Sequence, residues 1–454
     1  MRYDESVTYL YFVGRSWHTA LTGYQFPNNH LLYTLVAKVT SLLGGGAPWA
    51  LRLPAFAAGI AVLPLTYVLG CRMYTRVAAL VGTALVAAAT PMILYSANAR
   101  GYAFVIAAYL VLLLIGQRVR RDGPTLRRWV AFAFTAAAGL ATIPIMLYPL
   151  GAASLWLALA VTVGAHPRRR SILMGLVAAL AGAGVLTALA YLPIVRANGL
   201  DALIANKFVS GSSWPQFFAQ LGPSLEQAVV TWAQPYPPLV ALVVGAVTVV
   251  GVARSTRASR EGVSVLLAAY VWSAIVLLVD HRVPFTRTWL WMLPVVALAA
   301  GAACERLLHR PSLVVAVPYL PGIAAAVAAF GVGWGFATNA LGANTDTGVF
   351  AGAEPIAGML ATQTQPGDRI LAYLPSNAPL QYYLLRAGGD TALLSTPDSV
   401  TTREIIVLNA AYGQTVPWAI AVGMVDTSRF GPIAPATLAR DGDVFVAERR
   451  TGHP

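Results

Sequence analysis

Two adjacent acidic residues, Asp4 and Glu5, lie near the start of the chain, just ahead of a short apolar segment. A carboxylate pair at a membrane surface can take the proton from an acceptor hydroxyl or bind a divalent cation. The same two groups can also be solvated loop carboxylates without a chemical role. The residues themselves leave both interpretations open.

Three arginines stand just ahead of long apolar segments. Arg100 precedes one segment, and Arg282 and Arg287 precede another, with Asp280 close by in sequence. A guanidinium group binds phosphate oxygens through two parallel hydrogen bonds, which suits a lipid-linked phosphate. Arginines at helix ends can instead be snorkelling anchors that fix the depth of a helix. Both interpretations stay open at this point.

A third polar group, Asn28-Asn29-His30, begins the short apolar segment. Asparagine at this position favours helix capping, in which its side chain accepts from free backbone N–H groups. The alternative is a polar cluster at the boundary of water and lipid that holds a headgroup or a metal. The histidines have no zinc-type spacing, and no P-loop, dinucleotide fingerprint or Gly-x-Ser-x-Gly elbow is present.

The elements that position these residues are set by composition. Of the 454 residues, 57% are hydrophobic and 11% are charged, whereas a soluble domain carries about 25% charged residues. The net charge of +13 comes from short basic clusters between apolar runs, which is the positive-inside pattern of membrane proteins. No nucleic-acid partner is expected, and the chain is predicted to be a polytopic α-helical membrane protein.

Ten apolar runs are long enough to cross about 30 Å of hydrocarbon. They are Pro48–Cys71, Val77–Ser96, Gly101–Gln117, Trp129–Pro144, Leu147–Ala165, Ser171–Pro193, Pro237–Ala253, Val263–Val279, Thr288–Cys304 and Leu313–Ala337.

Alternate loops between these runs differ in charge. One set holds fifteen basic residues, including Arg168, Arg169 and Arg170, and the opposite set holds five. The positive-inside rule therefore places the first set in the cytoplasm and both ends of the chain outside. Cys71 and Cys304 fall at predicted cytoplasmic helix ends. An outer N-terminus needs a preceding helix, so we expect that a first membrane helix is missing ahead of Met1.

The stretch from Asn29 to Leu43 has helical spacing but is too short to cross the membrane at about 1.5 Å per residue. It is predicted to lie in the outer interface, where Gly44–Gly46 turns the chain into the first span. The expected domains are residues 1–47, an outer loop with this helix and the acid pair, and residues 48–339, the membrane domain.

Residues 340–454 form the third expected domain. Ten of the 18 acidic residues lie after Leu341. Strand-like and helix-like stretches, separated by Gly, Pro and Asp, predict a small α/β domain on the extracytoplasmic side. They are Arg369–Leu374, Leu380–Ala387, Glu404–Leu408 and Val444–Glu448.

Taken in order, these features resemble the GT-C glycosyltransferases, in the branch that contains protein O-mannosyltransferases and bacterial aminoarabinose transferases. The resemblance covers nearly the whole chain. It rests on Asp4-Glu5, Pro27-Asn28-Asn29-His30-Leu31-Leu32-Tyr33, Leu51-Arg52-Leu53-Pro54, and Pro91 followed by Tyr95-Ser96-Ala97-Asn98-Ala99-Arg100-Gly101-Tyr102.

The resemblance implies an inverting glycosyltransferase of the cell membrane that uses a polyprenyl-phosphate-linked sugar. Asp4 matches the family's catalytic base and Glu5 completes the pair, while Arg100, then Arg287, and Tyr102 are the candidates for the donor phosphate. The acceptor would be a glycan, lipid or protein hydroxyl on the outer face.

The chain departs from the family at Asn28-Asn29-His30, where relatives often carry a charged residue followed by Pro-Pro. The family's ligand at that point is not carried over, and a divalent cation remains an open expectation. Asn29, His30, Asp280 and Arg282 are further candidates for the site.

Two other functions compete with glycosyl transfer. A transporter or flippase of lipid-linked sugars would carry ionisable residues midway through its spans, and these spans are nearly free of them. The third alternative is a non-catalytic scaffold whose outer domain binds partners.

Overall fold

The computed structural model describes residues 1–25, 29–204, 211–233, 236–258, 263–308, 318–395, 397, 400–439 and 442–450. The chain divides into two compact units, one of Trp17–Leu341 and one that combines Met1–Ser16 with Gly342–Pro454. The division falls beside the boundary expected at about residue 340. It also separates the expected N-terminal domain into two parts, because the acid pair belongs to the unit with the C-terminal residues.

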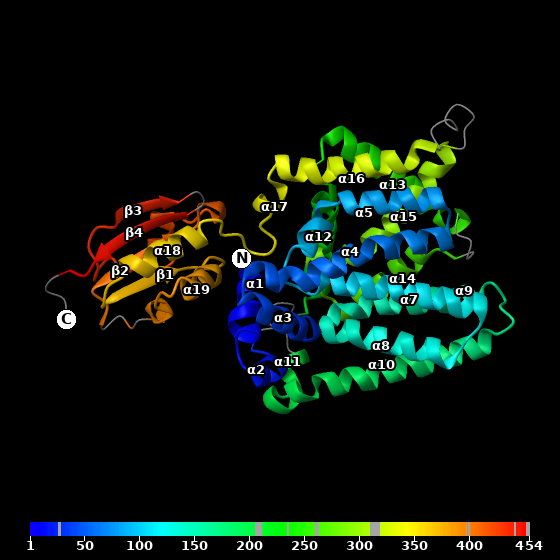
Figure 1. Cartoon of the computed structure of the whole chain (residues 1–454), viewed down its shortest axis with the longest axis horizontal. Helices are drawn as coiled ribbons and strands as arrows, with labels where there is room; N and C mark the ends of the chain where they lie inside the picture. Colours follow the sequence, from blue (N-terminus) through cyan, green and yellow to red (C-terminus); the bar gives the residue numbers. More distant parts are fainter. Residues whose placement is uncertain are drawn as a thin grey trace. The chain divides into compact units, whose positions relative to one another are not determined.

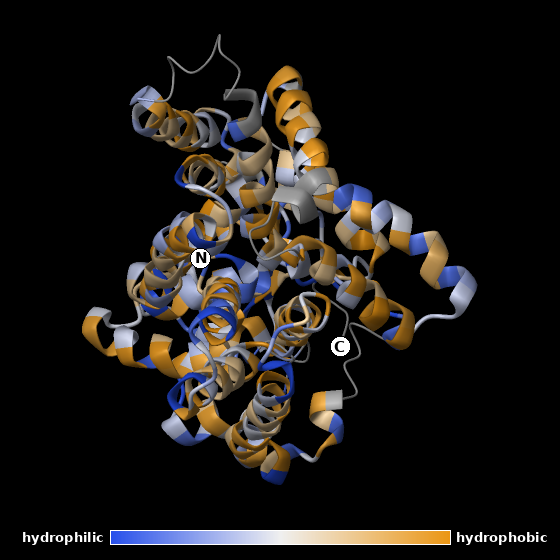
Figure 2. Cartoon of the chain, turned by 90° about the vertical axis from the view of Figure 1, so that its right-hand side faces the viewer, coloured by the Kyte–Doolittle hydropathy of each residue, from blue (hydrophilic) through white to orange (hydrophobic). Residues whose placement is uncertain are grey.

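The membrane unit is a bundle of helices, most of which run side by side, with α2, α3 and α11 at one end (Figure 1). Most of the helical ribbon is hydrophobic (Figure 2). Its helices are α2 (Trp17–Thr22), α3 (Leu31–Gly44), α4 (Pro48–Met73), α5 (Arg76–Ala88), α6 (Thr90–Ser96), α7 (Tyr102–Asp122), α8 (Leu126–Thr142), α9 (Leu147–Thr162), α10 (Arg169–Asn198), α11 (Asp201–Ile204), α12 (Trp214–Ala233), α13 (Pro238–Ala258), α14 (Val265–Asp280), α15 (Leu293–Leu308) and α16 (Leu320–Ala337), with the 3-10 turns η2 (Pro144–Met146) and η4 (Thr286–Met292).

A helix stands at each of the ten predicted spans, although residues 313–317 lie outside the described residues. Six described segments are long and apolar enough to cross a membrane, or seven if the bent pair α5 and α6 counts as one span. The remaining three helices, α8, α13 and α14, do not meet that criterion. By length and composition the described residues therefore support fewer crossings than the ten expected.

The predicted single span Val77–Ser96 is wrong in one respect, because the chain bends by 65° between α5 and α6. Ala89 is extended at the break, and Pro91 follows in the first turn of α6. Proline lacks an N–H and its ring collides with the carbonyl four residues earlier, which kinks or breaks a helix. After the bend, Tyr95 lies near the end of α6, and residues 97–101 connect this helix to Tyr102 at the start of α7.

The short helix predicted before the first span is confirmed as α3, which has 14 residues. Gly45 ends it in a left-handed conformation, and α4 begins at Pro48, where proline suits the first helical turn. Helix α12 was not predicted from the sequence. Two of its aromatic residues, Trp214 and Phe218, are exposed.

The second unit is a small α/β fold with α1 at its edge. Its elements are α1 (Tyr3–Thr8), the π-helical turn η1 (Tyr9–Val13), α18 (Ala353–Gln363), β1 (Asp368–Ala372), α19 (Asn377–Arg386), η6 (Thr391–Ser395), β2 (Arg403–Leu408), η8 (Ala410–Tyr412), α20 (Val416–Ala421), β3 (Ala434–Ala439) and β4 (Gly442–Glu448), while α17 (Ala340–Ala343) lies at the division between the units.

The four strands form one sheet in the order β1-β2-β4-β3. Strands β1 and β2 are parallel and are joined through α19, whereas β4 pairs antiparallel with both β2 and β3. The predicted strands at β1, β2 and β4 and the predicted helix at α19 are confirmed. Strand β3 was missed, because Ala434-Pro435-Ala436-Thr437 carries little strand propensity.

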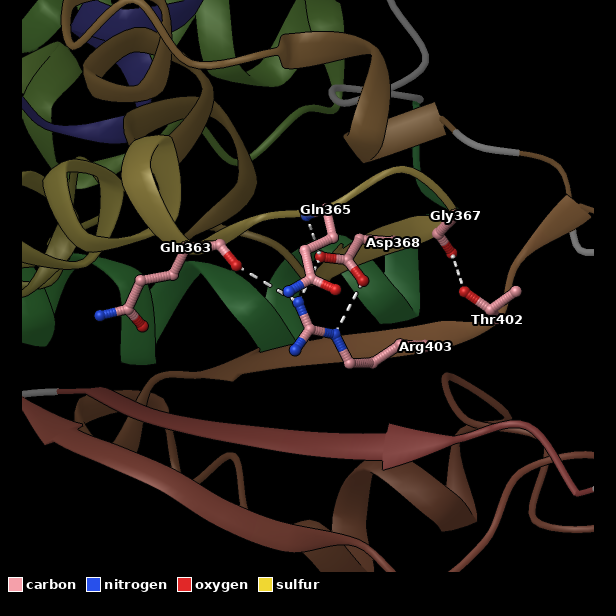
Figure 3. A network of polar contacts seen from close by, with 6 residues as sticks. All are labelled: Gln363, Gln365, Gly367, Asp368, Thr402 and Arg403. Carbon is pink, nitrogen blue, oxygen red and sulfur yellow. Dashed lines mark hydrogen bonds and ion pairs between the residues drawn. The ribbon is translucent and has the colours of Figure 1, made fainter.

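Alternate residues of β2 enter two separate cores. Ile405 and Val407 pack under α18 and α19, and Ile406 and Leu408 pack on the α20 side of the sheet. An ion pair ties the first residues of β1 and β2 together. Arg403 donates from Nε and Nη2 to the buried Asp368 carboxylate, at 2.7 and 2.5 Å (Figure 3).

Candidate active site

The acid pair lies on α1, where its two members have different surroundings. The buried Glu5 turns back to the start of the helix, and its Oε2 accepts the backbone N–H of Arg2 at 2.9 Å. This contact closes a capping box and gives Glu5 a structural role. Asp4 is half-buried, and its carboxylate has no hydrogen-bond or ion-pair partner among the described residues of its own unit. The arrangement favours Asp4 over Glu5 as the base.

His30 is the centre of a cluster in the membrane unit. It is buried at the start of α3, and its Nδ1 accepts the backbone N–H of Gly101 at 3.0 Å. Because Nδ1 is an acceptor, a neutral His30 carries its proton on Nε2. His30 and Gly101 lie in direct contact although they are 71 positions apart in the sequence.

The segment between α6 and α7 supplies the other side of this contact. Tyr102 begins α7, and its ring lies edge-on to His30 with centroids 5.7 Å apart. The Tyr95 ring also lies edge-on to Tyr102, with centroids 4.8 Å apart. A Cβ on Gly101 would lie 2.3 Å from the Thr142 methyl carbon, so only glycine lets the segment approach this closely.

Arg100 and Arg287 both act on His30. Burial lowers the pKa of His30 well below its usual range, and the positive charges of Arg100 and Arg287 lower it further. Arg100 is buried with 3% of its surface exposed, while Arg287 comes from η4 with its guanidinium 4.4 Å from the Phe285 ring. The structure thus brings His30 into contact with Tyr102 and with Gly101, the residue next to Arg100, while the charges of Arg100 and Arg287 act on the His30 ring. Guanidinium groups that act on one buried site suit an anion such as a phosphate.

The other predicted residues have different places. Asn29 does not cap α3, because its Nδ2 donates to the carbonyls of Ala20 and Gly23 and its Oδ1 accepts from the Thr34 hydroxyl. The capping interpretation is therefore wrong for Asn29, and Asn28 lies outside the described residues. Asn29 instead holds the preceding loop against α3.

Arg282 and Asp280 pair with each other at 3.3 Å at the end of α14. The positive charge of Arg282 is offset by this pair, and the pKa of His30 is lowered by the charges of Arg100 and Arg287. Between Asp280 and Arg282, His281 lies against Trp214 of α12, with ring centroids 3.7 Å apart.

Asn98 is a polar residue that sequence reasoning quoted in a motif but did not select. It is 1% exposed, and neither its Oδ1 nor its Nδ2 has a hydrogen-bond partner among the described residues. A buried amide without partners costs roughly 1–3 kcal/mol, so such groups are often ligand contacts. Its place two residues before Arg100 was the signal available in the sequence.

Metal ligation gives no further candidates in the described part of the chain. It contains no group of three or more His, Cys, Asp and Glu residues suited to a metal ion. A divalent cation therefore stays a prediction. Two surface cavities lie along α4, α7 and α8 around Arg118, and neither is lined by the residues of the His30 cluster.

The chain has the fold of a protein whose structure has been solved. The apo crystal structure of ArnT from Cupriavidus metallidurans matches it with a TM-score of 0.63 and 15% sequence identity, over 98% of this chain and 92% of ArnT. ArnT bound to undecaprenyl phosphate matches with a TM-score of 0.61 and 14% identity, over 99% of this chain and 93% of ArnT.

A second solved protein is also similar. The archaeal oligosaccharyltransferase AglB from Archaeoglobus fulgidus, in complex with an inhibitory peptide and a dolichol-phosphate, matches with a TM-score of 0.50 and 10% identity, over all of this chain and 70% of AglB. No protein-family model and no curated protein sequence matches the chain. These likenesses establish the fold alone, and the predicted helical bundle with a small C-terminal α/β domain is confirmed.

Proposed function

We propose that the protein is an inverting glycosyltransferase that moves a sugar from a polyprenyl-phosphate donor to an acceptor hydroxyl on the outer face of the membrane. The observation that carries this proposal is the buried cluster in which His30 contacts Gly101 and Tyr102 beside Arg100 in the chain, with the charges of Arg100 and Arg287 acting on His30. The fold adds support, because ArnT with this fold was solved with undecaprenyl phosphate bound. Glycan, lipid and protein hydroxyls remain the acceptor classes.

The proposed reaction is a direct displacement at the anomeric carbon. Asp4 takes the proton from the acceptor hydroxyl as that oxygen forms its bond to the anomeric carbon. The bond from the anomeric carbon to the phosphate oxygen breaks, and its electron pair leaves with the polyprenyl phosphate. Arg100 and Arg287 offset the negative charge that develops there, so that no acid is needed. Tyr102 supports His30 through its ring and thereby the segment that carries Arg100.

The transfer step is tested with the purified full chain in nanodiscs and a panel of polyprenyl-phosphate-linked sugars. Removing a general base costs about 10²–10⁴ in rate, so Asp4→Asn is expected to lose transfer to that extent without losing its fold. A product with the same anomeric configuration as the donor would exclude direct displacement. Full activity of Asp4→Asn would overturn the base assignment.

The phosphate-binding role is tested separately, by binding of undecaprenyl phosphate. Loss of one charged hydrogen bond is expected to weaken binding by about tenfold to a hundredfold in Arg100→Ala or Arg287→Ala. Arg196→Ala is the matched control, because Arg196 is exposed at the end of α10. Equal binding by all three variants would remove both arginines from the site.

The outer placement of the site rests on the asymmetry of fifteen basic residues against five in alternate loops. A membrane-impermeant maleimide added to whole cells is expected to label Ser395→Cys, an exposed position in the C-terminal unit. The native Cys71 and Cys304 are expected to stay unlabelled until the membrane is opened. The reverse pattern would invert the topology.

No observation in the described residues favours the transporter or flippase. Each of the six described spans has at most two charged residues in its apolar window. Movement of the lipid-linked sugar across vesicles, without transfer to any acceptor, would favour that alternative instead.

A further inference from the structure

The first residues of the chain are fixed to the loop that precedes α18. The backbone N–H of Tyr3 donates to the Gly348 carbonyl at 2.8 Å, and that of Asp4 points to the Thr347 carbonyl at 3.4 Å. The Arg2 guanidinium donates to the Asn344 carbonyl at 2.6 Å and to the Thr347 hydroxyl at 3.1 Å. All of these groups belong to one compact unit. The beginning of α1 is thus held by residues more than 340 positions further along the chain.

Gly348 has a geometry that only glycine meets. Its φ is +75°, a left-handed conformation that L side chains rarely adopt. A Cβ at this position would lie 2.4 Å from the Tyr3 Cβ and 2.9 Å from the Pro375 Cβ. The absence of a side chain therefore allows the loop to contact the residue immediately before Asp4.

The loop is in turn fixed to the end of β2. The Tyr412 hydroxyl accepts the Val349 N–H at 3.1 Å and donates to the Thr345 carbonyl at 3.0 Å. The fully buried Asn409, which directly follows β2, donates from Nδ2 to the Val349 carbonyl at 2.9 Å. A continuous set of hydrogen bonds therefore runs from the sheet through this loop to α1.

Helix α1 cannot hold its own direction, because it has only six residues and isolated helices of that length are not stable in water. Asp4 lies in its first turn, so the direction of the carboxylate follows the position of the helix start. We propose that the C-terminal unit positions the Asp4 carboxylate, with Gly348 and Tyr412 as positioning residues. This inference rests on the function proposed above, in which Asp4 is the base.

The test compares variants of the full chain for kcat, KM and thermal unfolding. Tyr412→Phe removes only the hydroxyl that ties the loop, and Gly348→Ala removes the close approach to Tyr3. Each is expected to lower kcat about tenfold or more with the donor KM unchanged within about twofold, because a displaced base acts on the chemical step alone.

Two control variants separate this effect from general strain. Gly423→Ala introduces a side chain at a similar φ of +71°, where nothing lies within 4 Å of the new Cβ. Tyr373→Phe removes the hydroxyl of a half-exposed tyrosine that packs on Trp418. Both are expected to keep kcat within about twofold of the unmodified protein.

A double-mutant cycle with Asp4→Asn provides the decisive readout. If Gly348 and Tyr412 act through Asp4, their substitutions are expected to cause no further loss in the Asp4→Asn background. An equal loss in both backgrounds, or an effect no larger than that of the controls, would overturn the positioning role. If Gly348→Ala fails to fold, Tyr412→Phe alone decides the outcome.

The two failures can be told apart. Full transfer by Asp4→Asn would overturn the base assignment and this inference together. An inactive Asp4→Asn protein with unaffected Gly348→Ala and Tyr412→Phe would overturn this inference and leave the proposed function intact.

Discussion

The substitution Gly101→Ala adds one methyl group and thereby tests the packing of the site. Its φ of −81° is accessible to alanine, so the backbone itself does not forbid Gly101→Ala. The added Cβ would lie 2.3 Å from Thr142 Cγ2, whereas ordinary contact begins at 3.4 Å. Relief of the difference, 3.4 − 2.3 = 1.1 Å, requires movement of the segment or of the end of α8.

We expect that movement to lower the free energy of unfolding and to weaken phosphate binding. Overpacking of this kind costs about 1–3 kcal/mol of the free energy of unfolding. A shift of about 1 Å also lengthens the 3.0 Å contact between Gly101 N and His30 Nδ1 beyond hydrogen-bond distance. Gly101→Ala is therefore expected to lower the thermal unfolding midpoint and to weaken undecaprenyl phosphate binding in the same variant.

A second substitution, at Thr142, tests whether the two side chains collide. Thr142→Ser removes the colliding methyl and keeps the hydroxyl that donates to the Ala138 carbonyl at 2.8 Å. In the double variant the two effects are expected to be non-additive, with a favourable coupling of about 1–2 kcal/mol. Gly184→Ala in α10 is the control, because nothing lies within 4 Å of its new Cβ. Additive effects, or a Gly101→Ala protein as stable as the control, would refute this account of the packing.

Two further predictions concern the C-terminal unit. Arg403→Leu is expected to cost about 3 kcal/mol or more of the free energy of unfolding, because it removes the guanidinium that pairs with the Asp368 carboxylate, which is only 2% exposed. Arg429→Leu, which breaks the exposed pair with Asp426, is expected to cost much less, because water screens that pair; similar losses in calorimetry would contradict the distinction. Burial raises the pKa of Glu404 to about 7 from its ordinary 4.5, so the folded state keeps a proton that the unfolded state releases. Stability of this unit is therefore expected to fall as the pH rises from about 4.5 to about 7, and Glu404→Gln is expected to remove that slope in calorimetric scans of the full chain.

The bundle could be predicted from the sequence because the bilayer imposes a simple rule on each segment. A run of apolar residues must satisfy its backbone internally and therefore forms a helix wherever it lies in the chain. The length rule says less about where a run bends, which is why the 65° break after α5 was missed. Strand β3 was missed for the opposite reason, since its partner β4 and not its own residue types makes it a strand.

The candidate site could be predicted only as separate residues. Arg100 and Arg287 were selected one at a time as phosphate ligands, but their common action on His30 depends on the packing of segments far apart in sequence. The capping interpretation failed at Asn29 because a tertiary contact with the carbonyls of Ala20 and Gly23 uses its side chain. No local pattern shows that Gly348 holds the helix of Asp4, because spacing rules describe neighbours within an element and not its partners.

We expect His30 to act as a neutral group in the site, and not as a third cation in addition to Arg100 and Arg287. Protonation at Nδ1 would turn the acceptor of the Gly101 N–H into a donor and break the contact that holds the residue next to Arg100. It would also add a positive charge beside two guanidinium groups in a buried position. A neutral ring therefore keeps the hydrogen bond that holds Gly101, the residue next to Arg100. In the proposed function, His30 positions this segment, and Arg100 and Arg287 are the groups that bind the phosphate.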